Sequence, residues 1–373
     1  MKITCQKADL NKGVNIVSKA VPTRTTKAIL ECILIDASSG EIKLTANDLE
    51  LGIETIINGT IIERGIIALD ANFLSKIVSK LPDTEITIET NSSFETFISY
   101  EKAGNKQRII GKPGDDFPYI PVIQRNQAIT LSQLTLKEIV RQTIFSVADN
   151  DTNKLMTGEL LEIKDNKLKV VALDGHRVSI RNVELKNPTS DVKVIVPKKT
   201  LNEIIKIIDG GIDDEVRIYV TDSHIIFEFD KTTVVSRIIE GEFFKIEQML
   251  SDNYETKIRI NKKQLFEVID RTTPYVHEGD KKPIIINVSD NIMSLSISSY
   301  NEYMTEDIDI DKEGKDIMIG FNPKFVMDAL KVIDDEEINL YMLNSKTPCF
   351  IKDDNGSFIY IVLPVNFNNP GAN

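Results

Sequence analysis

The chain has 373 residues, too many for one ordinary hydrophobic core, so two or three domains are expected. Its hydrophobic content of 41% is typical of a globular protein, and no apolar run approaches the roughly 18 residues that a membrane-spanning helix needs. The formal charge of −12 argues against a conventional nucleic-acid binder on average composition.

The cysteines and the first residues bear on redox chemistry and location. Cys5, Cys32 and Cys349 are far apart and form no CxxC pair, so we expect reduced thiols and neither a metal site nor a cofactor. The first residues, MKITCQKADL, lack the apolar core of a signal peptide. A cytoplasmic protein is therefore expected.

Hydrophobic residues at helical spacing predict six helices along the chain. In chain order these helices cover residues 9–19, 72–81, 135–145, 197–208, 262–271 and 323–333. The first, third and fifth share one pattern, in which Leu10, Leu136 and Leu265 correspond. The second, fourth and sixth share another pattern. Runs rich in β-branched residues, such as GIIALD before a helix and TEITIET after it, predict strands on both sides.

Both families of helices recur with a period of roughly 125 residues, the size of one small domain. We therefore predict an α+β fold of three repeated domains, each with two helices packed on antiparallel sheets. The predicted domains are residues 1–126, 127–252 and 253–373. The alternative is a chance similarity among leucine-rich helices. It is disfavoured because two interleaved families of helices share one period.

The segment VALDGHRVSI, residues 171–180, places an acid, a histidine and an arginine in a row, as a catalytic site would. The repeat aligns it with LTANDLELGI, residues 44–53, so that Asn-Asp-Leu-Glu stands in place of Asp-Gly-His-Arg. Catalysis would then be confined to one copy in three, and Asp-Gly is a favoured pair in turns between strands. A polar turn is preferred, and a hydrolase that uses Asp174, His176 and Arg177 is the alternative.

All six predicted helices carry net positive charge, which sums to +8 and leaves −20 for the remainder of the chain. Lysine is common on any solvated helix face, but glutamate is an equally good helix former, and the rest of this chain prefers acids. Basic helices on an acidic body fit a protein whose helices face nucleic-acid phosphates, in contacts that do not depend on sequence. No aromatic-rich motif for stacking single strands accompanies them, so a duplex is favoured.

The size of the predicted domains limits how they can surround a duplex. A duplex is about 20 Å across, and a domain of this length is about 35 Å in diameter. A ring with a hole of about 35 Å then takes roughly six such domains, so two chains are needed. The simplest closed assembly is a homodimer.

The chain resembles a known family, the bacterial sliding clamps, which are the β subunits of DNA polymerase III. The resemblance covers essentially the whole chain. It is carried by the threefold repeat and by the motifs VPTRTTKAIL, MTGELLEI, ALDGHRVSI, VIVPKKTLNEIIKIIDGG and YIVLPV. It implies three clamp domains that form half of a closed head-to-tail ring, with twelve helices lining the hole and loading by an ATP-driven machine.

The resemblance also implies a non-catalytic role. Such a ring tethers the replicative polymerase to double-stranded DNA and raises processivity through a high effective concentration. A site-specific DNA-binding regulator, which would retain affinity for short linear duplexes, is the alternative function.

A cleft for short peptides is a further implication of the resemblance, since polymerases, the clamp loader and repair proteins dock there in this family. Carried over by position, the cleft comprises Met156, Leu173, Gly175, His176, Arg177, Val178, Phe244, Gln248, Met249, Ile361, Leu363, Pro364, Val365 and Asn366. The sequence departs from the family pattern at the rim. Phe244 stands where proline is usual, and Gln248 and Asn366 stand where basic residues are common.

Candidate DNA contacts come from both sources. The charge of the second helix predicts Lys76 and Lys80. The resemblance implies that Arg24 lies in the family's DNA-contact loop and that Asn150 is a polar contact. It also implies that the basic helix of the middle domain contacts DNA through Lys198, Lys199 and Lys206. No catalytic residue is expected.

Overall fold

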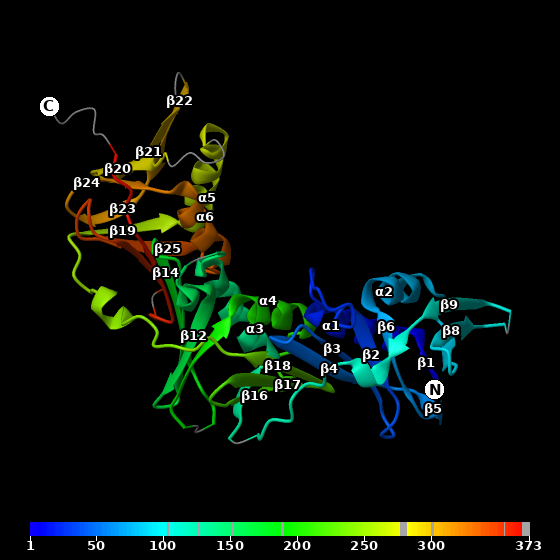
Figure 1. Ribbon diagram of the computed structural model, residues 1–373. Helices are drawn as coiled ribbons and strands as arrows, with labels where there is room; N and C mark the ends of the chain where they lie inside the picture. The colour runs from blue at the N-terminus through cyan, green and yellow to red at the C-terminus, as the bar shows by residue number, and fades with distance from the viewer. Residues whose placement is uncertain are drawn as a thin grey trace. The chain divides into compact units, whose positions relative to one another are not determined.

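A computed structural model of the chain describes residues 1–102, 104–125, 127–150, 152–187, 190–276, 282–299, 302–353 and 355–367. Within these residues the secondary-structure elements follow one order three times: a strand, a helix, four or five strands, a second helix and at least three strands (Figure 1). The predicted threefold repeat and the α+β fold are therefore confirmed.

The elements of the first repeat are β1 (Lys2–Gln6), α1 (Lys7–Val17), β2 (Cys32–Asp36), β3 (Ile42–Asn47), β4 (Leu51–Ile57), β5 (Thr60–Glu63), β6 (Ile66–Asp70), α2 (Ala71–Lys80), β7 (Glu85–Thr90), β8 (Glu95–Tyr100), β9 (Lys106–Ile110) and β10 (Lys112–Pro113). Those of the second are β11 (Ile129–Ser132), α3 (Gln133–Thr143), the 3-10 helices η3 (Ile144–Ser146) and η4 (Lys154–Thr157), β12 (Gly158–Lys164), β13 (Lys167–Leu173), β14 (Arg177–Glu184), β15 (Val192–Pro197), α4 (Lys198–Ile207), β16 (Glu215–Val220), β17 (His224–Phe229) and β18 (Thr232–Arg237).

The third repeat follows the 3-10 helix η5 (Ile246–Met249). Its elements are β19 (Thr256–Asn261), α5 (Lys262–Arg271), β20 (Ile284–Ser289), β21 (Ile292–Ser299), β22 (Glu302–Asp309), β23 (Asp311–Gly314), β24 (Ile317–Phe321), α6 (Pro323–Val332), β25 (Glu337–Met342), β26 (Cys349–Lys352) and β27 (Phe358–Val362).

All six predicted helices are present, and each begins and ends within two residues of the prediction. The hydrophobic spacing explains this, because it selects one buried face. In α2 the residues Leu74, Ile77 and Val78 are buried, whereas Lys76 and Lys80 are exposed. None of the helices in the described residues is long and apolar enough to cross a membrane.

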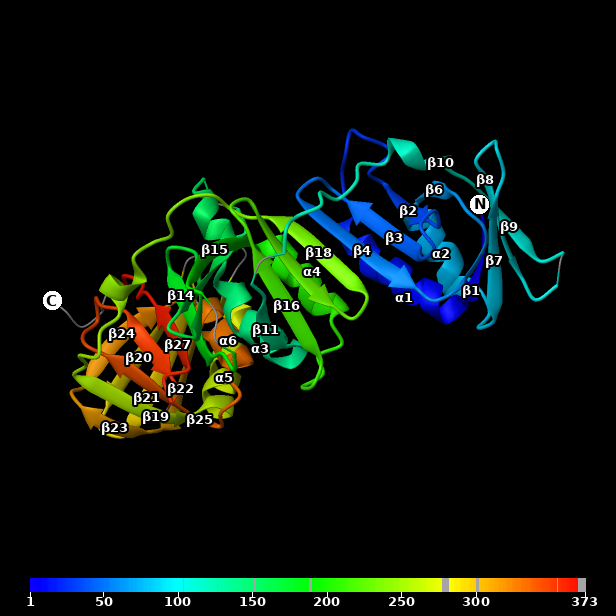
Figure 2. The ribbon, with the colours of Figure 1, turned by 90° about the horizontal axis from the view of Figure 1, so that it is seen from below.

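The chain divides into two compact units. One contains residues 1–137 and 199–238, with a five-stranded sheet (β5-β1-β7-β8-β9) and a nine-stranded sheet (β10-β6-β2-β3-β4-β18-β17-β16-β11). All strand pairs are antiparallel, and β4 of the first repeat joins β18 of the second (Figure 2). Helices α1 and α2 pack against each other in this unit.

The other unit contains residues 138–198 and 239–373. Its nine-stranded sheet (β15-β12-β13-β14-β27-β26-β25-β19-β23) joins the second repeat to the third where β14 pairs with β27, and a four-stranded sheet (β22-β21-β20-β24) completes it. Helices α5 and α6 lie side by side over a core of aliphatic residues, among them Leu265, Ile269, Val326 and Leu330 (Figure 1).

The predicted domain boundaries stay predictions. The two compact units divide the second repeat between them, because its strands pair with the first repeat on one side and with the third on the other. Residue 126, at the first predicted boundary, lies outside the described residues.

The turn between β3 and β4 corrects one detail of the repeat alignment. Asn47 pairs with Gly52 across this turn, as Leu173 pairs with Val178 across the turn between β13 and β14. Asp48, not Asn47, is therefore the counterpart of Asp174, and the offset is one residue shorter than the sequence alignment gave.

Candidate functional site

The segment 174–176 forms the predicted turn between β13 and β14. Asp174 closes it, because its Oδ1 accepts hydrogen bonds from the backbone N–H groups of His176 at 3.0 Å and Arg177 at 3.2 Å. Gly175 has φ +83°, in the left-handed region that glycine adopts without a steric penalty. The acidic side chain therefore builds the turn.

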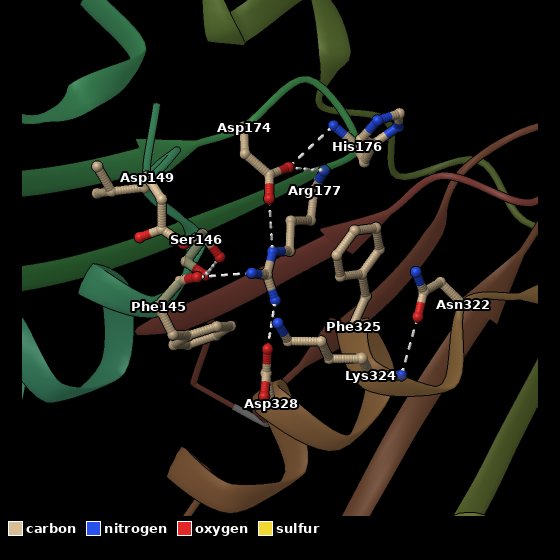
Figure 3. A network of polar contacts seen from close by, with 12 residues as sticks. Phe145, Ser146, Asp149, Asp174, His176, Arg177, Asn322, Lys324, Phe325 and Asp328 are labelled. Atoms are coloured by element: carbon tan, nitrogen blue, oxygen red, sulfur yellow. Dashed lines mark hydrogen bonds and ion pairs between the residues drawn. The ribbon is translucent and has the colours of Figure 1, made fainter. Parts of the chain in front are cut away.

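Arg177 lies under this turn with 7% of its surface exposed, and it bonds in three directions (Figure 3). Its Nε donates to Asp174 at 2.9 Å, its Nη1 donates to Asp328 of α6 at 2.8 Å, and its Nη2 donates to the carbonyl oxygen of Phe145 in η3 at 2.7 Å. The guanidinium also lies 4.5 Å from the ring centroid of Phe325. Arg177 thus ties the turn to helices of the second and third repeats.

His176 is exposed, and its imidazole stacks on Phe325 with ring centroids 5.9 Å apart and an interplanar angle of 22°. Both carboxylate oxygens of Asp174 are used by backbone N–H groups and by Arg177 (Figure 3). Asp174 therefore does not orient the imidazole, as an acid in a catalytic triad would.

An apolar cavity of about 130 Å³ opens beside the turn. Residues from η4, the end of β13, the turn, β14, the connection around η5 and the end of β27 line it: Met156, Leu173, Gly175, His176, Arg177, Val178, Phe244, Met249, Ile361 and Leu363. Its floor is the cluster of buried side chains on this face of the sheet, which includes Leu160, Val171 and Ile180. The end of β27 is held there because the backbone N–H of Leu363 donates to the carbonyl oxygen of His176 at 2.9 Å.

All ten residues that line the cavity belong to the predicted cleft. Four other predicted residues lie outside the lining. Gln248 is exposed in η5. After Leu363 the chain leaves the cavity for β24, where the N–H of Val365 donates to the carbonyl oxygen of Gly320 at 2.8 Å. The other three residues outside the lining are therefore Pro364, Val365 and Asn366. Peptide binding in this cavity stays a prediction.

Three functional neighbours were not predicted from the sequence. Phe145, Phe325 and Asp328 surround the guanidinium of Arg177, but they come from η3 and α6, far from the turn in the chain. The one sequence signal is an acid, Asp328, on a helix whose neighbouring positions Val326, Met327 and Ala329 are apolar and buried.

The predicted DNA-contact residues lie on exposed surface, with the exception of the half-buried Lys198. Lys76 and Lys80 share one side of α2, Arg24 lies in the loop before β2, and Asn150 follows η3. The α4 lysines are paired with acids: Lys198 with Asp149 at 2.6 Å, Lys206 with Glu203 at 2.8 Å and Lys199 with Asp48. The side chains of Lys199 and Lys206 remain about half exposed in these pairs, so a phosphate can reach them from the solvent side.

The chain matches family models of the DNA polymerase III beta subunit along nearly its whole length: the N-terminal domain at residues 1–121, the central domain at 130–245 and the C-terminal domain at 247–366. It is 32% identical over 377 residues to a beta sliding clamp of Staphylococcus epidermidis, an alignment that covers 98% of this chain and 99% of the relative.

Two solved structures are similar over the same length. A DNA polymerase sliding clamp from Bacillus subtilis has a TM-score of 0.94 and 31% identity, with 99% of this chain and 100% of that chain covered. A DNA polymerase III beta subunit chain from Eubacterium rectale has a TM-score of 0.95 and 68% identity, with 98% and 100% covered.

Proposed function

Because the chain belongs to the family of DNA polymerase III beta subunits, the bacterial sliding clamps, we propose that two copies close head to tail into a ring around duplex DNA. A sliding clamp is a non-catalytic processivity factor, which excludes the hydrolase alternative. The alternative of a site-specific regulator has no support among the relatives. We place the ring in the cytoplasm.

The pairing of strands between repeats is the observation that carries the proposal. Strand β4 pairs with β18, the last strand of the second repeat, and β14 pairs with β27, the last strand of the third. By position in the repeat, β22 corresponds to β4 and β14, and β9 corresponds to β18 and β27. In the described residues both β22 and β9 are edge strands. A second copy that lays its β9 against β22 repeats a junction that the chain already uses twice.

The two edges are complementary in charge. Strand β9 carries Lys106 and Arg108 and exposes 68% of the surface of Ile110. Strand β22 carries exposed acids at Glu302, Asp307 and Asp309. Unpaired backbone groups at a sheet edge favour a further strand, and opposite charges select the partner edge. The same contact occurs twice in a closed dimer.

The exposed lysines of α2 and α4 and the net charge of the predicted helices support contact with phosphates. We assign Arg24, Lys76, Lys80, Asn150, Lys198, Lys199 and Lys206 to the inner surface of the ring, in sequence-independent contacts. The acids paired with the α4 lysines compete with the phosphates, so we expect the contact with DNA to be weak enough for sliding.

The apolar cavity beside the turn is the proposed docking site for partner peptides of the replicative polymerase, the clamp loader and repair proteins. Its lining offers contacts to aliphatic or aromatic anchors, and the turn and the end of β27 offer backbone groups at the rim. Gln248 directly precedes the lining residue Met249, and Pro364, Val365 and Asn366 come after the lining residue Leu363, so we place these four at the outer rim.

A test of the ring uses nicked circular DNA and a bacterial clamp loader with ATP. We expect the protein to stay on the circle and to slide off after the circle is linearised. Ile110→Asp should give a folded monomer that is not retained, because a charge enters the edge contact. Sedimentation equilibrium measures the oligomer, and Ile62→Asp, on the opposite edge strand β5 and 55% exposed, is the matched control. Retention on linear DNA with open ends contradicts the ring.

A test of the cleft combines Leu363→Ala with Pro364→Ala. We expect this variant to lose stimulation of the polymerase in a primer-extension assay, because an apolar wall of the cavity is removed. Dimerisation and retention on circular DNA should survive, since β9 and β22 are unchanged. Unchanged stimulation would refute the assignment of the cleft.

A further inference from the structure

The cleft has a structural counterpart at the turn between β3 and β4. Oδ1 of Asp48 accepts hydrogen bonds from the backbone N–H groups of Glu50 at 2.9 Å and Leu51 at 2.6 Å, as Asp174 does in its own turn. Leu49, with φ +78°, stands where the other turn has Gly175 at φ +83°. The two turns therefore share one backbone conformation.

A cavity of about 260 Å³ lies beside this turn, within one compact unit. Asn47, Leu49, Glu50, Gly52, Tyr119, Ile120, Pro121, His224, Val235 and Arg237 line it. Six of them occupy the repeat positions of cleft residues, because Gly52 pairs with Val235 as Val178 pairs with Ile361: Asn47, Leu49, Glu50, Gly52, Val235 and Arg237. The connection between repeats supplies a wall in both cavities.

Leu49 is costly to keep in this conformation. A left-handed backbone is rare and strained for a bulky residue, whereas glycine adopts it freely. The side chain nevertheless exposes 45% of its surface, so much of its apolar surface is open to a ligand. A strained, exposed leucine at the rim of a cavity fits a contact with a ligand.

The walls of the cavity differ in polarity. Tyr119 exposes 62% of its surface beside Leu49, and Arg237 is exposed at the end of β18. Burial, together with the charge of Arg237, lowers the pKa of His224, whose Nδ1 lies 2.8 Å from the hydroxyl of Ser223. Among the lining residues Arg237 is the permanent cation, and Glu50 carries the opposite charge at the turn.

We propose that the cavity at Leu49, Tyr119 and Arg237 is a second docking site for short peptides, which takes an aliphatic or aromatic anchor followed by an acidic side chain. The inference rests on the proposed function, in which partners reach the ring through short peptides. Arg237 replaces Leu363 and Asn47 replaces Leu173 at equivalent positions, so the two sites select different peptides. One chain can then hold two partners at once.

The test uses three fluorescein-labelled pentapeptides, Gly-Leu-Phe-Xaa-Gly, in which the fourth residue is Asp, Asn or Lys. The protein carries Leu363→Ala and Pro364→Ala, so that the cleft beside Arg177 does not bind the peptides. In fluorescence anisotropy we expect the Asp peptide to bind about tenfold more tightly than the Lys peptide. Arg237→Glu should reverse this order, and Arg217→Glu, an exposed arginine of β16 in the same sheet, should leave it unchanged.

Leu49→Gly separates binding from folding. Glycine relieves the left-handed backbone, so the melting temperature should stay or rise, whereas affinity for the Asp peptide should fall about tenfold. Equal binding of the three peptides, or unchanged binding by Leu49→Gly, overturns the second site. If the cleft of the unaltered protein binds no partner peptide while this selectivity holds, the assigned cleft fails and the second site stands.

Discussion

Arg177→Ala should lower the free energy of unfolding by about 3–5 kcal/mol, because it leaves charged partners without their counter-ion in a largely buried site. Arg177 is the shared partner of Asp174 and Asp328, whose side chains are only 15% and 19% exposed. The same change removes a donor to the carbonyl oxygen of Phe145. Urea unfolding followed by circular dichroism measures the loss, since the chain contains no tryptophan.

Two variants define the cause. Arg177→Lys keeps the charge but cannot donate to all three partners. Its free energy of unfolding should therefore lie between those of the wild type and Arg177→Ala. Lys167→Ala removes an exposed pair with Glu184, 3.9 Å apart at the far end of the same hairpin, and should cost less than about 1 kcal/mol. A loss of less than about 1 kcal/mol for Arg177→Ala would show that the network does not stabilise the fold.

Much of the fold was predictable from the sequence because the repeat multiplies a weak signal. One helix pattern is ambiguous, but three copies at one period fix both helix families, and the structure contains all six. The same repeat misplaced the turn by one residue. Asn47 and Asp48 both suit a turn, and only the pairing of Asn47 with Gly52 decides between them.

The site was predictable in part, through the resemblance and not through spacing. The ten lining residues of the cleft were all in the predicted set, but nothing in the local sequence shows that Asp328 and Phe325 reach Arg177 from another repeat. Backbone strain is equally invisible. The left-handed conformation of Leu49 follows from the turn geometry, which the sequence LTANDLELGI does not reveal.

The burial of Glu159 is a further feature that the alternation of residues in the strand does not predict. It lies in β12 opposite Val196, is fully buried, and neither carboxyl oxygen has a hydrogen-bond partner among the described residues. The nearby hydroxyl of Thr143 donates elsewhere, to the carbonyl oxygen of Ile139 at 2.8 Å. Burial raises the pKa of Glu159 from 4.5 to about 8, against smaller opposing effects of Thr143 and Lys198. The folded protein therefore holds this proton at neutral pH.

The sign of the pH dependence follows from that proton. Between pH 4.5 and about 8 the folded state keeps it and the unfolded state releases it, so the free energy of unfolding falls as pH rises through this window. Below the window both states are protonated, and above it both are ionised, so the contribution is constant there. The total change is on the order of 5 kcal/mol.

Glu159→Gln should remove this dependence, because the amide has nearly the same shape and does not ionise. Relative to the wild type, the variant should gain several kcal/mol of unfolding free energy between about pH 5 and pH 8.5, measured by urea unfolding at each pH. Glu162→Gln, in the same strand with its side chain 28% exposed beside Lys193, is the matched control and should show a much flatter difference. If the difference curve for Glu159→Gln is as flat as the control, the buried carboxyl titrates near its ordinary pKa and the site must be hydrated.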